Sequence, residues 1–171
     1  LVGSEMCIRD RTFFRLFIFF FALMKYDYDI TLAFKKEWQK IILDWYSFNK
    51  RDLPWRKKTH QNFYKIWISE IMLQQTQVKT AIPYFKKFVR KYPTLRSLKN
   101  ASEDEILSLW SGLGFYKRAR NIYATKEIIF DQFNGEFPTT FEKIIKLPGI
   151  GRSTAGAILS LSLNQKFPIL D

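Results

Sequence analysis

The segment from Leu147 to Leu163, LPGIGRSTAGAILSLSL, constrains the fold more than any other part of the chain. A Pro-Gly-x-Gly turn joins two stretches with apolar residues at helical spacing, which predicts two helices meeting at a tight corner. Gly149 and Gly151 permit unusual backbone angles and leave no Cβ in the way of a ligand. The second helix begins near Arg152, and its free N–H groups point out of the turn. The segment is therefore predicted to bind a phosphate; the alternative is an ordinary helical corner ended by glycine.

The remainder of the chain shows the same helical periodicity, and no strand-type alternation competes with it. Ser102 with Glu105 and Thr139 with Glu142 match the capping-box pattern at helix starts. Pro83 is expected to kink or begin a helix. The pattern predicts an all-α fold of short helices around one core. The expected helices cover residues 31–48, 63–77, 80–92, 102–111, 115–130, 139–146 and 152–163.

Composition limits the chemistry that the chain can perform. The formal net charge is +12, from 28 Lys and Arg against 16 Asp and Glu. Such a surplus favours nucleic acid or an anionic membrane surface as partner; the alternative is a proteome in which Lys is simply common. A single cysteine, Cys7, and a single histidine, His60, exclude an intramolecular disulfide and Cys/His metal clusters. We predict no metal site in this chain, and chemistry that rests on carboxylates, hydroxyls, amides or lysine.

The first 23 residues are expected to be a non-native leader, because Met24 begins a plausible natural start. The apolar run Leu16–Met24 is too short to span a bilayer, and no signal-peptidase pattern follows it. We therefore leave residues 1–23, with Cys7, out of the functional reasoning. Residues 24–62 are predicted to form an N-terminal helix and a basic loop, and residues 63–171 the main helical domain.

Glu70 is the first candidate for catalysis. It lies in IWISEIML, residues 66–73, a helix that is apolar nearly all round and is therefore predicted to be buried. A buried carboxylate is costly unless it is paired or protonated, and desolvation would let it donate a proton near neutral pH. The alternative is a structural glutamate satisfied by an arginine or a backbone N–H.

Several motifs resemble the helix–hairpin–helix DNA glycosylase superfamily, which includes endonuclease III, and within it the A/G-specific adenine DNA glycosylases. The likeness runs from about Trp38 to Asp171. It implies a six-helix barrel with a helix–hairpin–helix at residues 139–163, truncated before the iron–sulfur part of the family fold. The motifs are RDLPWR (51–56), WISEIMLQQTQV (67–78), IPYFKKF (82–88), LWSGLGFYKRARN (109–121), FPTTFEKIIKLPGIGRSTAGAILSLSL (137–163) and FPILD (167–171).

The resemblance assigns catalytic roles to Glu70, Asp171 and Ser153. Glu70 would protonate the extruded adenine at N7, and Asp171 would stabilise the oxocarbenium-like sugar, as in glycoside hydrolysis by two carboxylates. Asp171 could also be a helix N-cap. Ser153 stands where endonuclease III-like enzymes have the lysine that forms a Schiff base, so we expect no strong lyase activity. It would either hydrogen-bond to Glu70 or simply allow close helix packing.

The resemblance also implies a set of DNA contacts, since glycosidic attack needs the base out of the stack. Trp55 would stack on a base or cover the core, and Phe115 would wedge the duplex or belong to the core. Arg118 would contact phosphate or lie on a solvated helix face. The full set is Arg51, Leu53, Trp55, Arg56, Leu73, Gln74, Gln75, Thr76, Leu113, Phe115, Arg118, Gly149, Gly151, Arg152, Ser153 and Thr154.

These matches predict a base-excision enzyme that hydrolyses the N-glycosidic bond of adenine paired with 8-oxoguanine or G. The partner would be double-stranded DNA and not a membrane, and the protein a monomer, in the cytoplasm rather than in a nucleus or mitochondrion. The family carries a 4Fe-4S cluster whose cysteines follow Asp171, so this fragment is expected to be inactive alone. The alternatives are a pyrimidine-lesion glycosylase/lyase, a non-catalytic DNA-binding module, and membrane binding through Leu16–Met24.

Overall fold

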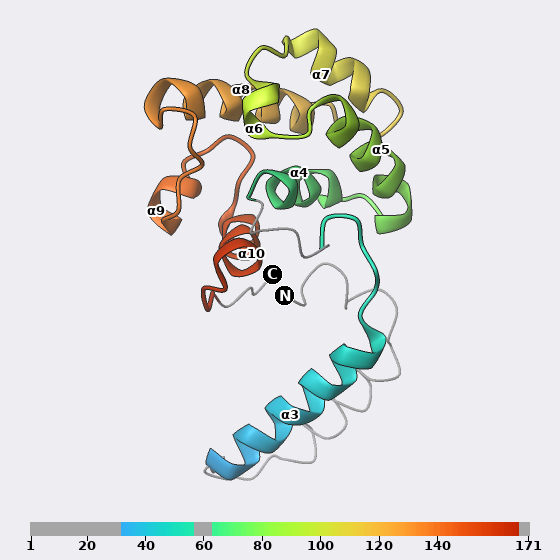
Figure 1. Ribbon diagram of the computed structural model, residues 1–171, viewed down its shortest axis with the longest axis vertical. Helices are drawn as coiled ribbons and strands as arrows, with labels where there is room; N and C mark the ends of the chain where they lie inside the picture. Colours follow the sequence, from blue (N-terminus) through green and yellow to red (C-terminus); the bar gives the residue numbers. More distant parts are fainter. Residues whose placement is uncertain (1–31, 57–62, 168–171) are drawn as a thin grey trace. The chain divides into compact units, whose positions relative to one another are not determined.

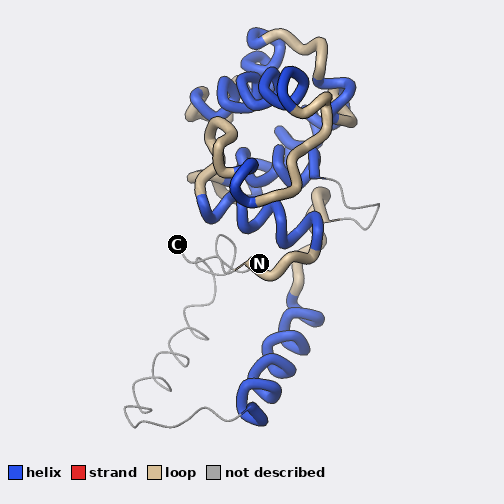
Figure 2. The backbone as a smooth tube through the Cα atoms, turned by 90° about the vertical axis from the view of Figure 1, so that its left-hand side faces the viewer, coloured by secondary structure: helices blue, strands red, loops and turns tan. Residues whose placement is uncertain are grey.

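The computed structural model describes residues 32–56 and 63–167. The predicted leader (1–23), His60 and Asp171 lie outside the described residues. All regular secondary structure in the described ranges is helical (Figures 1 and 2). None of these helices combines the length and the apolar character that crossing a bilayer requires. The prediction of an all-α fold is confirmed.

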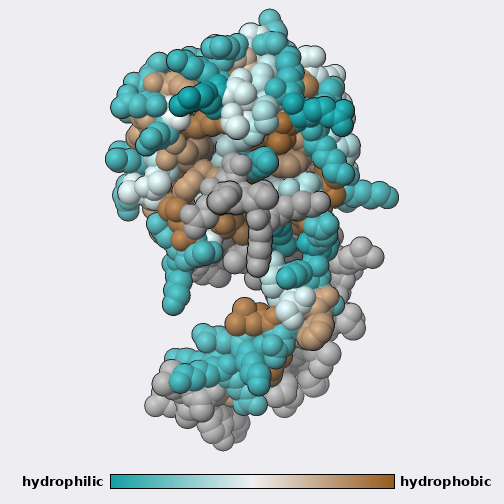
Figure 3. All heavy atoms as spheres, in the orientation of Figure 1, coloured by the Kyte–Doolittle hydropathy of each residue, from teal (hydrophilic) through white to brown (hydrophobic). Residues whose placement is uncertain are grey.

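The contacts divide the chain into two units, one ending at Asp52 and the other beginning at Leu53. In the first, helix α3 (Leu32–Asn49) carries an edge-to-face pair, Phe34 and Trp38, with ring centroids 6.0 Å apart. The division falls earlier in the sequence than the predicted boundary after residue 62, because Leu53 and Trp55 are buried in the second unit. α3 also exposes the apolar side chains of Ile41, Ile42, Leu43 and Phe48. Figure 3 shows the hydropathy of each residue on one face of the molecule, with hydrophobic residues in brown.

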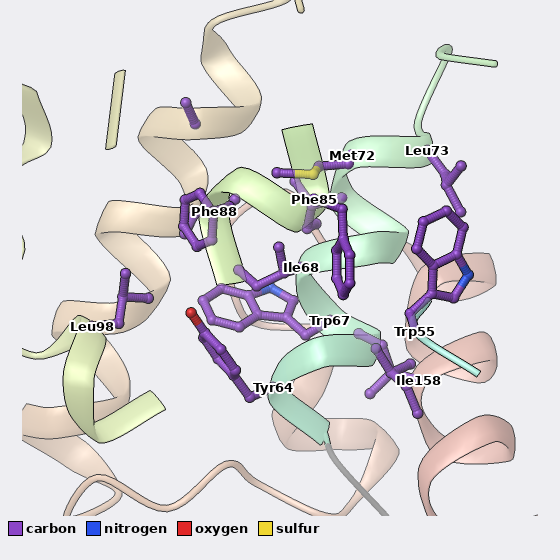
Figure 4. Packing of buried hydrophobic residues seen from close by; sticks show 14 of the residues in the cluster. Trp55, Tyr64, Trp67, Ile68, Met72, Leu73, Phe85, Phe88, Leu98 and Ile158 are labelled. Carbon is purple, nitrogen blue, oxygen red and sulfur yellow. The ribbon is translucent and has the colours of Figure 1, made fainter. Parts of the chain in front are cut away.

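The second unit contains seven of the described helices, and α4 lies at its centre (Figure 1). α4 packs against α5, α8 and α10, while α7 bridges α5 and α8. The side chains of Trp67, Ile68 and Met72 on α4 are fully buried in the core shared by these helices (Figure 4). The helices are α4 (Phe63–Leu73), α5 (Val78–Lys91), α6 (Leu95–Leu98), α7 (Glu103–Trp110), α8 (Lys117–Gln132), α9 (Phe141–Ile144) and α10 (Arg152–Leu163).

Local chemistry explains where these helices begin and end. The capping box predicted for α7 is confirmed: the Ser102 side chain accepts from the backbone N–H of Glu105, whose carboxylate accepts from the N–H of Ser102. α4 ends at Leu73 rather than at residue 77, because Gln75 adopts a left-handed φ of 55°. α5 begins at Val78 and contains Pro83 instead of starting there.

Two further predictions about helix starts need correction. The capping box at Thr139 and Glu142 is wrong, because α9 has Thr140 as its N-cap and no side-chain cap hydrogen bond. The short helix α6 was not predicted. Its cap is a reciprocal Thr94–Ser97 pair, which departs from the Ser/Thr-x-x-Glu/Gln signature.

Candidate active site

The turn between α9 and α10 contacts helix α8. Thr125, fully buried on α8, donates a hydrogen bond to the carbonyl of Pro148 at 3.2 Å. Gly149 has a φ of 76°, and a Cβ at this position would meet Nδ2 of Asn121 at 2.5 Å. Only glycine satisfies both the backbone angle and the close approach of α8. The helix–hairpin–helix predicted at residues 139–163 is present, and its turn is hydrogen-bonded to α8.

The first turn of α10 has no side-chain cap. Its N-cap residue is Gly151, whereas α6 and α7 are each capped by a reciprocal pair of side chains. A Cβ at Gly151 would have no atom within 4 Å, so the approach to this helix end is open. Uncapped N–H groups and the positive end of a helix dipole suit an anion. Arg152 is exposed beside them, with its guanidinium 5.7 Å from the ring centroid of Phe141.

The turn that follows α4 is tied directly to this hairpin. Nε2 of Gln74 donates to the carbonyl of Gly149 at 3.0 Å and to Oγ1 of Thr154 at 3.3 Å. The Thr76 hydroxyl donates to the carbonyl of Gln74 at 3.4 Å, and Gln75 is exposed. Two motifs that lie 75 positions apart in the sequence therefore meet at one surface.

The loop between α7 and α8 contributes one exposed aromatic ring. Phe115 is 60% exposed and has a φ of 50°, a conformation that is strained for a bulky residue. Gly112 and Gly114 precede it with φ of 92° and 79°. The indole N–H of Trp110 donates to the carbonyl of Gly114 at 3.1 Å and closes the loop. The alternative that Phe115 is a core residue is therefore wrong.

The alternative that Arg118 lies on a solvated helix face is wrong. Its side chain is buried, with 6% of the residue exposed. Nη1 donates to the carbonyls of Met72 and Gln74 at 2.7 and 2.6 Å. Burial lowers the pKa of the guanidinium below its usual value. Arg118 thus joins the end of α4 to α8 from inside the protein.

Three other predicted substrate contacts also face inward. Leu53, Leu73 and Leu113 are each less than a tenth exposed, so they belong to the core. Trp55 packs edge-to-face on Phe85 with ring centroids 5.1 Å apart, which favours its alternative role of covering the core. Arg51 is exposed at the end of the first unit, and Arg56 is half-buried in the second.

Glu70 and Ser153 lie on helices that pack against each other, α4 and α10. The prediction that this helix is buried is confirmed, with Ser69 and Ile71 on either side of Glu70 buried, whereas Glu70 itself is half-buried. Ser153 is half-buried in the first turn of α10. Both residues are therefore partly accessible, on helices that pack against each other.

Sequence reasoning missed Asn121 and Thr125, which support the hairpin. They are spaced i, i+4 on α8 and therefore share one face of the helix. A fully buried threonine one helical turn from an asparagine would have indicated a packed loop, but the sequence alone does not show this burial. No group of three or more His, Cys, Asp or Glu side chains that could hold a metal occurs within residues 32–56 and 63–167.

The comparisons with known proteins agree with this geometry. Residues 68–171 match the family described as HhH-GPD superfamily base excision DNA repair protein. The chain belongs to this superfamily. A thermostable thymine-DNA glycosylase has a similar structure, with a TM-score of 0.74 and 26% identity over 84% of this chain and 65% of that one. A trapped endonuclease III–DNA complex, at 24% identity and a TM-score of 0.61 over 73% of this chain and 57% of its own, shows the fold alone.

The sequence relatives point to one branch of the superfamily. The chain is 61% identical over 133 residues to the adenine DNA glycosylase of Buchnera aphidicola subsp. Schizaphis graminum, covering 77% of this chain. It is 42% identical over 137 residues to the human adenine DNA glycosylase, covering 76% of this chain. It spans 38% of the length of the first relative and 25% of the second.

Proposed function

We propose that this protein is a base-excision DNA glycosylase that hydrolyses the N-glycosidic bond of adenine paired with 8-oxoguanine or G. The observation that carries the proposal is the tie between the α4 turn and the hairpin through Gln74, with its bond of 3.0 Å to Gly149. This bond joins the turn that follows the helix of the candidate acid Glu70 to the candidate phosphate-binding turn, which supports a single site. Identity of 61% to an adenine DNA glycosylase supports adenine as the base.

The proposed chemistry uses one carboxylate on each side of the bond that breaks. Glu70 donates a proton to N7 of adenine, which makes the base a neutral leaving group. Asp171 stabilises the positive charge that develops on the sugar as the C1′–N9 bond breaks. Water then adds to C1′ and releases a proton, which leaves an abasic site and free adenine. Ser153 carries no amine, so it cannot form an imine with the sugar, and strand cleavage is not part of the reaction.

Some of the proposed DNA contacts position the DNA backbone, and others help to extrude the base. The open N-terminus of α10, with Gly151, Arg152 and Thr154, binds a backbone phosphate without reading sequence. Gln75 and Phe115 are the exposed side chains that fill or wedge the duplex beside the flipped base. A net charge of +12 supports double-stranded DNA as the partner. We further propose a monomer that acts in the cytoplasm, at the nucleoid.

The residues of this chain do not fit the iron–sulfur cluster that the fold family implies. A 4Fe-4S cluster needs four cysteine thiolates, and the sequence has one cysteine, Cys7. The mechanism above therefore includes no step through a cluster.

A chimera tests the proposal, because this chain spans 38% of the Buchnera relative. The matching 133 residues of this chain replace their counterparts in that protein, and the product is incubated with a duplex containing A opposite 8-oxoguanine. We expect adenine release, detected as an alkali-labile site. Glu70→Gln should keep duplex binding and lose release by at least about a hundredfold, in the range of general acid catalysis. Normal turnover by this variant would refute the acid assignment.

The absence of lyase activity has its own test. Sodium borohydride reduces an enzyme–sugar imine to a stable covalent bond, so it captures bifunctional glycosylases on abasic DNA. The chimera should release adenine without being captured. Efficient capture would contradict the role given to Ser153 and would favour the glycosylase/lyase alternative.

A further inference from the structure

The buried side chain of Arg118 donates hydrogen bonds to two separate turns of the proposed DNA-facing surface. Nη1 donates to the carbonyls of Ile71, Met72 and Gln74 at 3.3, 2.7 and 2.6 Å. Nη2 donates to the carbonyl of Gly114 at 3.1 Å. The guanidinium therefore joins the end of α4 to the loop before α8, while 6% of the residue is exposed.

The chemistry of these bonds is specific to arginine. The last carbonyls of an α-helix have no partner within the helix, and α4 ends at Leu73. A planar guanidinium offers several N–H donors in a fixed fork, whereas a lysine offers one charged centre. The guanidinium carbon also lies 5.5 Å from the ring centroid of Trp110 and 5.3 Å from that of Phe115, which holds its plane in place.

The connection continues beyond Arg118 to the hairpin. The backbone of Gln74 accepts from Arg118, and the side chain of Gln74 donates to the carbonyl of Gly149 at 3.0 Å. Three turns are thus linked by hydrogen bonds through two residues. We call residues 74–76, 112–116 and 148–151 the three-turn frame. Two of its members, Gln75 and Phe115, have left-handed backbone angles that require support from their surroundings.

We propose that Arg118 is a positioning residue that holds the three-turn frame in one arrangement, so that the duplex can be gripped at the hairpin and wedged at Gln75 and Phe115 together. This use of the frame rests on the proposed glycosylase function. Removing the guanidinium leaves the hairpin seated on α8 through Thr125 and bonded to Gln74, but uncouples both from the loop that carries Phe115. Phosphate binding survives this change, and extrusion of the base does not.

Lys126 provides a matched control on the same helix. Its residue is 2% exposed, and Nζ donates to the carbonyls of Lys99 and Ala101 at 3.2 and 2.9 Å. It is thus a second buried cation of α8 that satisfies backbone carbonyls, and these lie between α6 and α7. It also forms an ion pair with Glu127 of α8, and all of these partners lie outside the frame. Arg118→Met and Lys126→Met both remove a buried charge and its hydrogen bonds, and only the first touches the frame.

Amide hydrogen exchange of this chain tests the positioning role without any catalysis. The N–H of Thr76 donates to Leu73 and that of Leu113 donates to Trp110, at 3.1 and 2.9 Å, so both are protected in the native state. With rates normalised to core amides of α8, Arg118→Met should speed exchange at both sites by about tenfold or more. Lys126→Met should leave both within about twofold. Equal effects of the two variants, or no effect of Arg118→Met, would overturn the proposal.

The Buchnera chimera tests the functional consequence. Arg118→Met should lower the single-turnover rate of adenine release by about tenfold or more while the Kd for undamaged duplex stays within about twofold. Arg118→Lys should restore less than half of the rate, since it lacks the fork. Parallel losses of rate and duplex affinity would overturn the uncoupling. If the parent chimera releases no adenine, the proposed function fails, and the exchange experiment still decides the role of Arg118.

Discussion

Gly149→Ala is the substitution whose cost the structure determines most closely. Gly149 sits in the hairpin turn with a φ of 76°. An alanine Cβ there would lie 2.5 Å from Nδ2, 2.9 Å from Cβ and 3.0 Å from Cγ of Asn121. The Cβ of Asn121 is fixed by helix α8, so rotating its amide away relieves only part of the overlap.

Two contributions add to give the expected destabilisation. Placing a Cβ in the left-handed region costs about 1–2 kcal/mol. Overpacking against Asn121 adds about 1–3 kcal/mol, because α8 and the hairpin must separate by several tenths of an ångström. The free energy of unfolding should therefore fall by roughly 2–5 kcal/mol. The double variant with Asn121→Ala should recover about 1 kcal/mol, since Nδ2 and Cγ are removed and the Cβ contact remains.

Two other glycines separate these contributions. Gly114 has a φ of 79°, and a Cβ added there would meet nothing within 4 Å, so Gly114→Ala should show the backbone strain alone, about 1–2 kcal/mol. Gly151 has a φ of −86° and the same open space. Gly151→Ala should cost about 0.5–1 kcal/mol, because alanine is a poorer N-cap than glycine.

Urea unfolding followed by tryptophan emission measures all four variants, since Trp67 and Trp110 are fully buried in this unit. The midpoint should fall in the order Gly151→Ala, Gly114→Ala, Gly149→Ala. A cost for Gly149→Ala that matches Gly114→Ala within about 0.5 kcal/mol would show that the Asn121 contact carries no energy. A neutral Gly149→Ala would refute the backbone argument as well.

Three further predictions concern stability and binding. The pKa of Glu105 is lowered to about 2, first by the backbone N–H of Ser102 and then by Lys91. The contribution of the Glu105 carboxylate to stability is therefore complete above its usual pKa and disappears as the pH falls towards 2. In thermal melts, the Tm difference between the parent and Glu105→Gln should shrink between about pH 6 and pH 2, and a constant difference would count against this role of the carboxylate. Phe88→Ala should cost about 3–5 kcal/mol in urea unfolding because the ring is fully buried, whereas Phe48→Ala, at a residue that is 88% exposed, should stay within about 0.5 kcal/mol. Arg152→Ala should weaken duplex binding of the chimera and lower the salt dependence of log Kd by about one counterion, and an unchanged slope in a salt titration would remove Arg152 from the phosphate site.

The order of the helices was predictable because their signals are local. Apolar spacing, the Ser102–Glu105 box and the glycines around the hairpin each act within a few residues. The errors arose where tertiary contacts override local preference. α4 stops at Leu73, where Gln75 adopts a left-handed φ and Arg118, distant in sequence, satisfies the carbonyls of Ile71 and Met72. Such a contact leaves no mark in the periodicity of α4.

The candidate site was predictable in part, and the limit lies in side-chain direction. The motifs led to Gln74, which hydrogen-bonds to Gly149 of the hairpin, and to Phe115, whose ring is exposed. Motif membership does not distinguish a residue that faces DNA from one that supports it from behind. Arg118, Leu113 and Trp55 belong to the matching motifs yet face the interior. The sequence KRARN, in which Lys117 precedes Arg118 and Ala119 follows it, is compatible with either an exposed or a buried arginine.

The uncapped N-terminus of α10 links the stability of the folded protein to ligand binding at that helix end. α6 and α7 satisfy their first N–H groups with their own side chains, whereas Gly151 contributes none. The first N–H groups of α10 therefore have no side-chain acceptor from the N-cap, and a ligand that accepts from them would stabilise the helix. Whatever binds there adds RT ln(1 + [L]/Kd) to the stability of the folded state. The hairpin couples folding to ligand concentration, and the protein is most stable where its ligand is most abundant.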